Sequence, residues 1–293
     1  MAGVFISKTL KVPLVVDIVD LWPESLSAAG FVTNKSLLHA IGIAERWLYH
    51  HCTALSVVTK GYKSCLVKLG VESSRINIIN HWVPNTYRHL GRNLPSLPSG
   101  DEEFWILYAG TMGPAQGLET ILDAASRLRD HPRVRWLMVG SGLHEAKLRA
   151  YAEKLGLKNI KFTGRIPQKE IQKLIPKVGA CVVHLRSTNL SVVSIPSKTY
   201  TYLAMGRPIL MALEGEAAEL VKKHKCGIAV APEDPDAIAG AAVSLAEMSS
   251  DELIKISQAA LKAFDESYSS TIGVKRMAKL LDKYASKSSE NTT

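Results

Sequence analysis

From about residue 104 onward, short apolar runs alternate with segments whose apolar residues recur at helical spacing. The runs have the length and composition of buried parallel strands, and they cover residues 105–109, 135–139, 160–163, 180–184, 208–212 and 227–230. One helical stripe comprises Leu118, Ile121, Leu122, Ala125 and Leu128. This alternation predicts a parallel sheet covered by helices on both faces, and ligands of such sheets bind at the carboxyl ends of the strands.

The first 90 residues show a sparser version of the same pattern. Strands are predicted at residues 14–19, 54–59 and 76–79, and helices near 37–49 and 62–69. Three strands make a small sheet with a small core, so we expect this domain to be incomplete and to lack its opening strands. The predicted organisation is α/β throughout: a partial domain at 1–90, a linker at 91–100, a complete domain at 101–265, and a last helix with a polar tail at 266–293.

Composition narrows the class of protein. Hydrophobic residues make up 46% of the 293 residues and charged residues 22%, which is typical of a globular protein. The apolar runs fall short of the ~18 residues of a membrane helix, and the N-terminus lacks the basic start of a signal peptide. Four scattered cysteines, with no C-x-x-C pair, favour a reduced, cytoplasmic protein and predict no metal site.

Basic residues are densest in the first third of the chain. Net charge is +9, and residues 1–100 contribute +5 of it through 10 Lys/Arg against 5 Asp/Glu. A basic surface there would suit anionic lipid headgroups or a phosphorylated acceptor, and a merely solvated surface is the alternative. We therefore expect peripheral contact with the inner face of the cell membrane. Nucleic acid is not expected as a partner, because no helix-turn-helix, RNA-binding or zinc-finger signature occurs.

Several strand-end loops could contact a phosphate. The first contains Gly110, Gly113 and Gly117 between a strand and a helix, so backbone N–H groups and the helix dipole could face an anion. A tight turn is the alternative. The loop is not G-x-G-x-x-G and lacks a Walker lysine, which argues against a nicotinamide cofactor or a P-loop; no cofactor is predicted. Residues 140–142 are a weaker glycine signal, equally typical of a plain turn.

The longest loop, residues 185–196, leads into a helix whose first turn contains Lys198. The helix dipole disfavours a lysine there unless an anion is present, so Lys198 indicates a nearby diphosphate; a flexible surface lysine is the alternative. Arg165, after the third strand of this domain, could pair with a phosphate or be solvated.

Four stretches together resemble the GT-B glycosyltransferases of family 4, in the bacterial and archaeal surface-polysaccharide branch: residues 20–25, 108–118, 162–166, and 195–198 continuing through 204–208. The resemblance covers nearly the whole chain. It implies two Rossmann-like domains, the first on the acceptor side and the second binding a nucleotide-sugar donor, which is a substrate and not a cofactor.

The resemblance also implies roles for individual residues. Gly110, Gly113 and Gln116 would line the donor diphosphate, and many relatives have lysine where Gln116 stands. The base would be held by Gly164, Arg165 and Ile166, and the diphosphate and sugar would be faced by Ser194, Ile195, Pro196, Ser197 and Lys198. Thr201 occupies the place of a glutamate that normally grips the ribose hydroxyls.

The resemblance implies retaining transfer without a metal, in which the donor phosphate helps deprotonate the acceptor. A UDP-linked hexose or N-acetylhexosamine is the expected donor, and a lipid-linked glycan or polysaccharide the expected acceptor. Asp20 is the acceptor-side catalytic candidate, with loop capping as its alternative. Two other readings stay open: a truncated or degenerate homologue that binds without transfer, and a sugar-nucleotide epimerase, for which we find no suitable acidic cluster.

Overall fold

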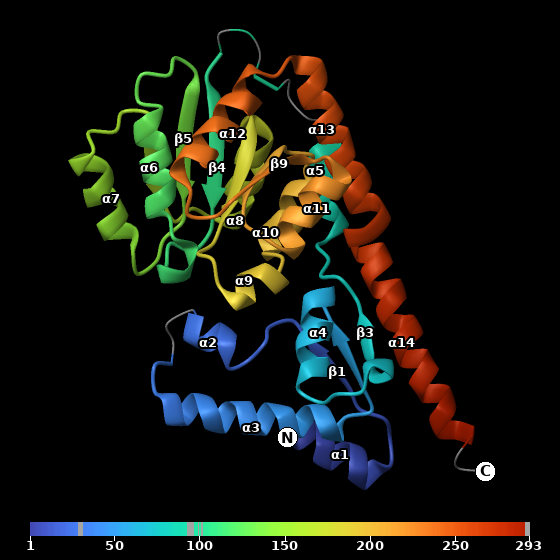
Figure 1. The fold of residues 1–293 in the computed structure, drawn as a ribbon. Helices are drawn as coiled ribbons and strands as arrows, with labels where there is room; N and C mark the ends of the chain where they lie inside the picture. Colours follow the sequence, from blue (N-terminus) through green and yellow to red (C-terminus); the bar gives the residue numbers. More distant parts are fainter. Residues whose placement is uncertain (29–31, 93–96, 99, 101, 291–293) are drawn as a thin grey trace. The chain divides into compact units, whose positions relative to one another are not determined.

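The computed structural model describes residues 1–28, 32–92, 97–98, 100 and 102–290. These residues form two compact units, one made of residues 1–82 and 270–293 and the other of residues 83–269 (Figure 1). Each unit has its own parallel sheet, and each is described by itself below.

The first unit contains a parallel sheet of β1 (Val15–Ile18), β2 (Ala54–Val57) and β3 (Ile76–Ile78), in that order. Its helices are α1 (Ala2–Leu10), α2 (Glu24–Ala28), α3 (Lys35–His51), α4 (Lys60–Lys68) and α14 (Ser270–Glu290), with a short 3₁₀ turn at Ser73–Arg75. Side chains cap two of the helices: Asn34 accepts from the backbone of α3, and Thr59 accepts from the backbone of α4. The central strand β2 is buried along its whole length, so it forms the core of this unit.

Helix α14 packs closely on the segment that follows β3. A methyl group added to Gly273 would lie 2.2 Å from the Trp82 ring, so only glycine allows this approach. The Arg276 guanidinium also donates to Asn80 Oδ1 at 3.3 Å. The last helix of the chain is thereby fixed to the same unit as the first strands.

The second unit contains a six-stranded, fully parallel sheet with strand order β6-β5-β4-β7-β8-β9. The strands are β4 (Phe104–Ala109), β5 (Val134–Val139), β6 (Ile160–Gly164), β7 (Ala180–His184), β8 (Ile209–Ala212) and β9 (Gly227–Val230). Counted along this unit, the order is 3-2-1-4-5-6, that of a doubly wound Rossmann sheet. The direction of winding reverses between β4 and β7, and such a switch point is where ligands of this fold bind.

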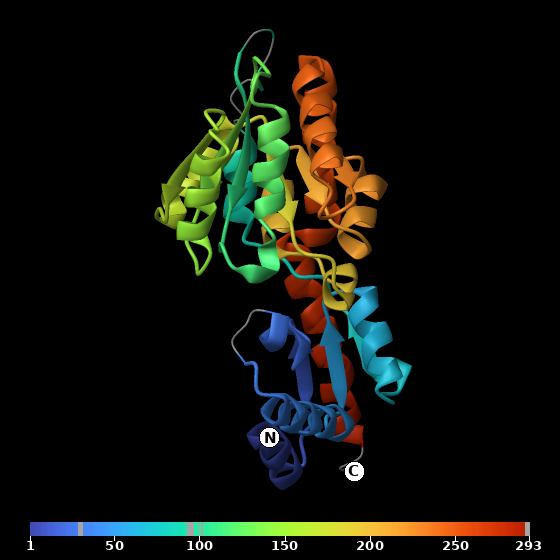
Figure 2. The same ribbon diagram turned by 60° about the vertical axis from the view of Figure 1, so that its left-hand side comes forward.

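Helices cover both faces of this sheet (Figures 1 and 2). One hydrophobic cluster includes α6 (Glu119–Arg127), α7 (Glu145–Lys154) and α12 (Pro235–Glu247). The other includes α5 (Asn85–Arg92), α10 (Ser197–Ala204) and α11 (Glu216–His224), with α13 (Ser250–Ala263) contributing to both clusters. The short helices α8 (Gln168–Leu174) and α9 (Asn189–Val193), with 3₁₀ turns at Pro114–Gln116 and Ile175–Lys177, connect strands. A short π-helix at Phe264–Tyr268 follows α13.

The structure confirms the predicted α/β class and all nine predicted strands. It differs from the sequence-based expectation at residues 85–92, which form helix α5 where the end of the small domain and the start of a linker were expected. The reason is burial: Tyr87 is buried in the second unit, and the Arg88 guanidinium pairs with Asp265 at 3.0 Å. Of the predicted linker, residues 93–96 and 99 lie outside the described residues.

Candidate functional site

The loops that follow β4, β5 and β6 lie side by side at the carboxyl edge of the six-stranded sheet. The Met112 N–H donates to the Ser141 carbonyl at 2.9 Å, and the Gly140 N–H donates to the Gly164 carbonyl at 3.0 Å. The predicted donor-contacting glycines at positions 110 and 164 are therefore joined through the loop at 140, which the sequence marked only weakly.

Gly140 is a glycine because the neighbouring loop leaves no space for a side chain. Its φ is +136°, and an added Cβ would lie 1.8 Å from the Gly110 carbonyl oxygen. At Gly142 the same addition would lie 2.5 Å from the Met112 carbonyl oxygen. These contacts bring the backbones of two strand-end loops together, which a plain turn would not require.

Lys198 lies against the first of these loops. Its Nζ is 4.0 Å from the centroid of the Tyr108 ring, and a Cβ added to Gly110 would be 2.6 Å from that nitrogen. The side chain is partly buried, and among the described residues Nζ has no ion pair or hydrogen bond. Burial lowers the pKa of Lys198 to about 7. The structure therefore does not support a flexible surface lysine; this amine lacks a counter-charge, and an anion could supply one.

The first loop contains a 3₁₀ turn before its helix begins. Gly113 is extended, Pro114–Gln116 form the turn, and α6 starts only at Glu119. The Gln116 side-chain oxygen accepts the Gly113 N–H at 2.9 Å, so it is used inside the loop. Within the described chain, no acceptor is found for the backbone N–H groups of Thr111 and Ala115. These two donors are available to an anion.

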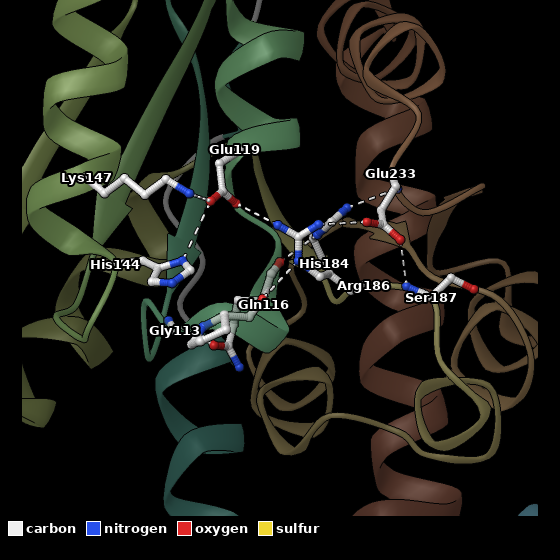
Figure 3. A network of polar contacts seen from close by, with 10 residues as sticks. Gly113, Gln116, Glu119, His144, Lys147, His184, Arg186, Ser187 and Glu233 are labelled. Atoms are coloured by element: carbon white, nitrogen blue, oxygen red, sulfur yellow. Dashed lines mark hydrogen bonds and ion pairs between the residues drawn. The ribbon is translucent and has the colours of Figure 1, made fainter. Parts of the chain in front are cut away.

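Charged side chains surround this turn (Figure 3). The Glu119 carboxylate contacts Lys147 at 3.0 Å, the His144 ring at 3.6 Å and Arg186 at 3.3 Å. Arg186 also pairs with Glu233 at 2.9 Å. The sequence did not predict this network, because its members come from helices and loops that are far apart in sequence and no local motif marks them.

The remaining donor-side candidates lie on α10, on the connection that precedes it, and directly after β6. Lys198 and Thr201 stand three residues apart on α10 and so share a helix face. Ser194, Ile195 and Pro196 form the connection from α9 to α10, and Ser197 is the first residue of α10. Arg165 is exposed and has no ion pair with any residue that the structure describes. Ile166 packs its side chain against the hydrophobic cluster on the α10 face of the sheet.

Asp20 belongs to the first unit. It is exposed and stands two residues after β1. The charge of Asp20 contributes to the pKa values of Tyr62 and His81. Burial, reinforced by Asp20, raises the pKa of Tyr62 to about 12. Burial lowers the pKa of His81, while Asp17 and Asp20 oppose that shift. Polar groups thus gather at the carboxyl edge of the small sheet, and the role of Asp20 stays a prediction.

The described residues include no group of three or more His, Cys, Asp or Glu side chains arranged to hold a metal ion. Within the same residues, every helix is too short or too polar to cross a membrane.

The chain is similar to known proteins along most of its length. The family model described as "Glycosyl transferases group 1" matches residues 103–248. The putative colanic acid biosynthesis glycosyl transferase WcaI of Escherichia coli K12 is 29% identical over 206 residues, which are 66% of this chain and 49% of WcaI. The probable glycosyltransferase WbjE of Pseudomonas aeruginosa is 21% identical over 268 residues, 88% of this chain and 65% of WbjE. The chain thus spans from about half to two-thirds of these relatives.

A solved structure supports the fold assignment. Anabaena Alr3699/HepE in complex with UDP superposes with a TM-score of 0.77 at 16% identity, covering 96% of this chain and 75% of HepE. At this identity the similarity establishes the fold, which is the GT-B-like arrangement expected from the sequence.

Proposed function

We propose, because this chain belongs to the group 1 glycosyltransferases, that its second unit binds a nucleotide-sugar donor and that the protein transfers the sugar to a lipid-linked glycan or polysaccharide. One observation carries this proposal: the amine of Lys198 lies beside the backbone of Gly110 without a counter-charge. A diphosphate would supply that charge.

The shape of the site supports a diphosphate over a single small anion. The N–H groups of Thr111 and Ala115 lie on the same loop as Gly110, so donors are spread along the loop while the Lys198 amine approaches from α10. Charge-assisted contacts of this kind are the strong ones in phosphate recognition. HepE, which has this fold, is described in complex with UDP, and this supports uracil as the base.

We extend the proposal to retaining transfer without a metal. In that reaction the bond between the sugar and the donor phosphate breaks, the acceptor oxygen bonds to the same face of the sugar, and the departing phosphate takes the acceptor proton. Lys198 would stabilise the negative charge that grows on the leaving diphosphate. Asp20 would orient the acceptor hydroxyl. The relative WcaI, described as a putative colanic acid biosynthesis glycosyl transferase, supports a surface polysaccharide as the product.

Thermal melting of the full chain with UDP, GDP and ADP tests donor binding. A ligand at a hundredfold excess over its Kd should add about 2.7 kcal/mol to the free energy of unfolding, and we expect UDP to give the largest shift. If none of the three raises the melting temperature at millimolar concentration, the proposal is wrong.

The second candidate function is binding without transfer. Thr201 favours it, since the family resemblance implies a ribose-gripping glutamate at the position of this threonine. Incubation with UDP-sugars and a lipid-linked acceptor separates the two candidates: product formation supports the enzyme, and binding with neither transfer nor donor hydrolysis supports the binding protein.

Thr201→Glu is expected to tighten UDP binding. A carboxylate can accept hydrogen bonds from both ribose hydroxyls, and Thr201 shares the helix face of Lys198. The expected gain is about 1–2 kcal/mol, close to tenfold in Kd. Calorimetric titration should show a smaller gain for 2′-deoxyuridine diphosphate. Unchanged or weaker UDP affinity, with melting of the free protein unaltered, would show that Thr201 does not face the ribose.

We also propose peripheral contact with the membrane through the first unit. On α1, Phe5 is 74%, Ile6 53% and Leu10 64% exposed, and Lys8 and Lys11 lie beside them. Apolar side chains with basic neighbours suit an anionic lipid surface, where each basic residue contributes about 1 kcal/mol.

Sedimentation with vesicles tests this contact. The protein should bind vesicles containing phosphatidylglycerol more strongly than vesicles of phosphatidylcholine alone, and the double variant Phe5→Ser/Leu10→Ser should bind several times more weakly. Val274→Ser, at an exposed position of α14, is the control. Equal sedimentation of all three proteins with both vesicle types would contradict the proposal.

A further inference from the structure

The 3₁₀ turn at Pro114–Gln116 is held by residues at the end of β7. The carbonyl oxygens of three consecutive residues, Pro114, Ala115 and Gln116, each contact one of these residues. Arg186 Nε donates to the Pro114 carbonyl at 3.1 Å, and the Arg186 N–H donates to the Ala115 carbonyl at 2.9 Å. His184 Nδ1 lies 2.7 Å from the Gln116 carbonyl (Figure 3). All the carbonyls of the turn are therefore directed toward the end of β7.

The contacts of His184 fix its protonation state. The ring is fully buried, and its Nε2 accepts the Glu233 N–H at 3.2 Å. A backbone N–H can only donate and a backbone carbonyl can only accept, so Nε2 carries a lone pair and Nδ1 carries the proton. The imidazole is neutral, and it connects the loop after β4 with the loop after β9.

Glu233, in the loop after β9, holds Arg186 and the neighbouring Ser187 in place. Its backbone has a φ of +56°, which is uncommon for a residue with a side chain. Its carboxylate accepts the Ser187 N–H at 3.0 Å and pairs with Arg186 at 2.9 Å. Arg186 therefore has a fixed position when it contacts the Pro114 carbonyl.

We propose that His184 and Arg186 are positioning residues for the donor site, because by holding the carbonyls of residues 114–116 they aim the free N–H of Ala115 at the diphosphate. The geometry of the peptide bond links the direction of the Pro114 carbonyl to the direction of the Ala115 N–H. A trans peptide directs its C=O and N–H in opposite directions, so turning the Pro114 carbonyl toward Arg186 turns the Ala115 N–H away from it. This inference rests on the proposed function, since it concerns the same donor site.

The arrangement also makes donor binding sensitive to acid. Burial lowers the pKa of His184; the nearby carboxylates of Glu233 and Glu119 oppose this shift, and the Arg186 guanidinium adds to it. An imidazolium cannot accept the Glu233 N–H, so protonation of His184 in acid removes that contact. The neutral amide of asparagine can donate to one partner and accept from the other at any pH.

The experiment compares UDP binding by the wild-type protein, His184→Asn, His184→Phe and Arg186→Gln at pH 7.5 and pH 5.5. His184→Phe and Arg186→Gln should bind about tenfold more weakly at pH 7.5, the size of effect expected for one or two lost hydrogen bonds. His184→Asn should bind nearly as well as wild type at pH 7.5 and should bind UDP more tightly than wild type at pH 5.5. Because UDP and Lys198 are the same in each titration, their own protonation cancels when the proteins are compared at one pH. His39→Asn, at an exposed position of α3, is the control.

Amide hydrogen exchange over residues 111–117 gives a second readout that needs no ligand. It should be faster in His184→Phe and Arg186→Gln than in wild type. Wild-type affinity and wild-type exchange in both variants would overturn the positioning role, even if UDP binding itself is established. Absence of UDP binding to the wild-type protein would instead contradict the proposed function, and exchange would then decide whether the residues order the loop.

Discussion

Replacing Lys198 with alanine is expected to weaken UDP binding by one to two orders of magnitude and to leave uridine binding unchanged. The amine lies beside Gly110 and over the Tyr108 ring, where only the phosphates of the donor would meet it. A charge-assisted hydrogen bond is typically worth about 1.5–3 kcal/mol, which is roughly 10- to 150-fold in Kd. Calorimetric titration with UDP and with uridine measures the two affinities separately.

Lys222→Ala is the matched control, because Lys222 is an exposed lysine on α11 of the same unit. Its UDP affinity should equal that of the wild type. Equal UDP affinities for Lys198→Ala and wild type would show that Lys198 does not contact the donor. The proposed function would then lose its main structural support.

Donor binding should also depend on pH through Lys198. Burial lowers the pKa of the free protein's Lys198 to about 7, and a bound diphosphate favours the charged amine and raises that pKa again. The sign follows: below pH 7 the amine is already charged, whereas above pH 7 it must take up a proton on binding, so UDP affinity falls as pH rises from 7 to 9. Titrations in two buffers of different ionisation enthalpy should reveal proton uptake at pH 8.5. The Lys198→Ala protein should show neither effect.

The sequence predicted the sheets well because buried parallel strands are apolar along their whole length. Residues 180–184 and 227–230 were predicted with the bounds that the structure gives them. Helices that bury little were harder to predict. Helix α1 buries only Val4, so its apolar residues show no one-sided pattern. Helix α5 falls in a stretch with glycine and proline close by, and its anchor, Tyr87, is a single residue.

The donor site was predictable only where one loop carries its own signal. Glycines after a strand and a lysine in a helix's first turn pointed to the surroundings of Gly110 and Lys198, and the structure brings these two residues together. The contacts by which His184, Arg186 and Glu233 hold the turn at Pro114–Gln116 join loops that are far apart in sequence. It also depends on a positive φ at Glu233, which nothing in the sequence around it requires.

Gly140→Ala is expected to have the largest effect on the empty protein and to abolish detectable UDP binding. The added methyl carbon would lie 1.8 Å from the Gly110 carbonyl oxygen, and a φ of +136° disfavours alanine even without that contact. The clash is with backbone, so one of the two loops must move, at a cost of about 1–3 kcal/mol or more in the free energy of unfolding. Denaturant unfolding and UDP titration measure the two consequences.

Gly240→Ala distinguishes this clash from a general effect of replacing glycine. Gly240 is exposed within α12, and no atom lies within 4 Å of the added carbon. Alanine is the better helix former, so stability should rise by about 0.5–1 kcal/mol while UDP binding stays unchanged. Because Gly110 lies next to Lys198, displacement of the first loop by Gly140→Ala should abolish detectable UDP binding even under conditions where the variant remains folded. A Gly140→Ala protein that unfolds at the wild-type denaturant concentration and binds UDP normally would show that the loops after β4 and β5 are not packed as described.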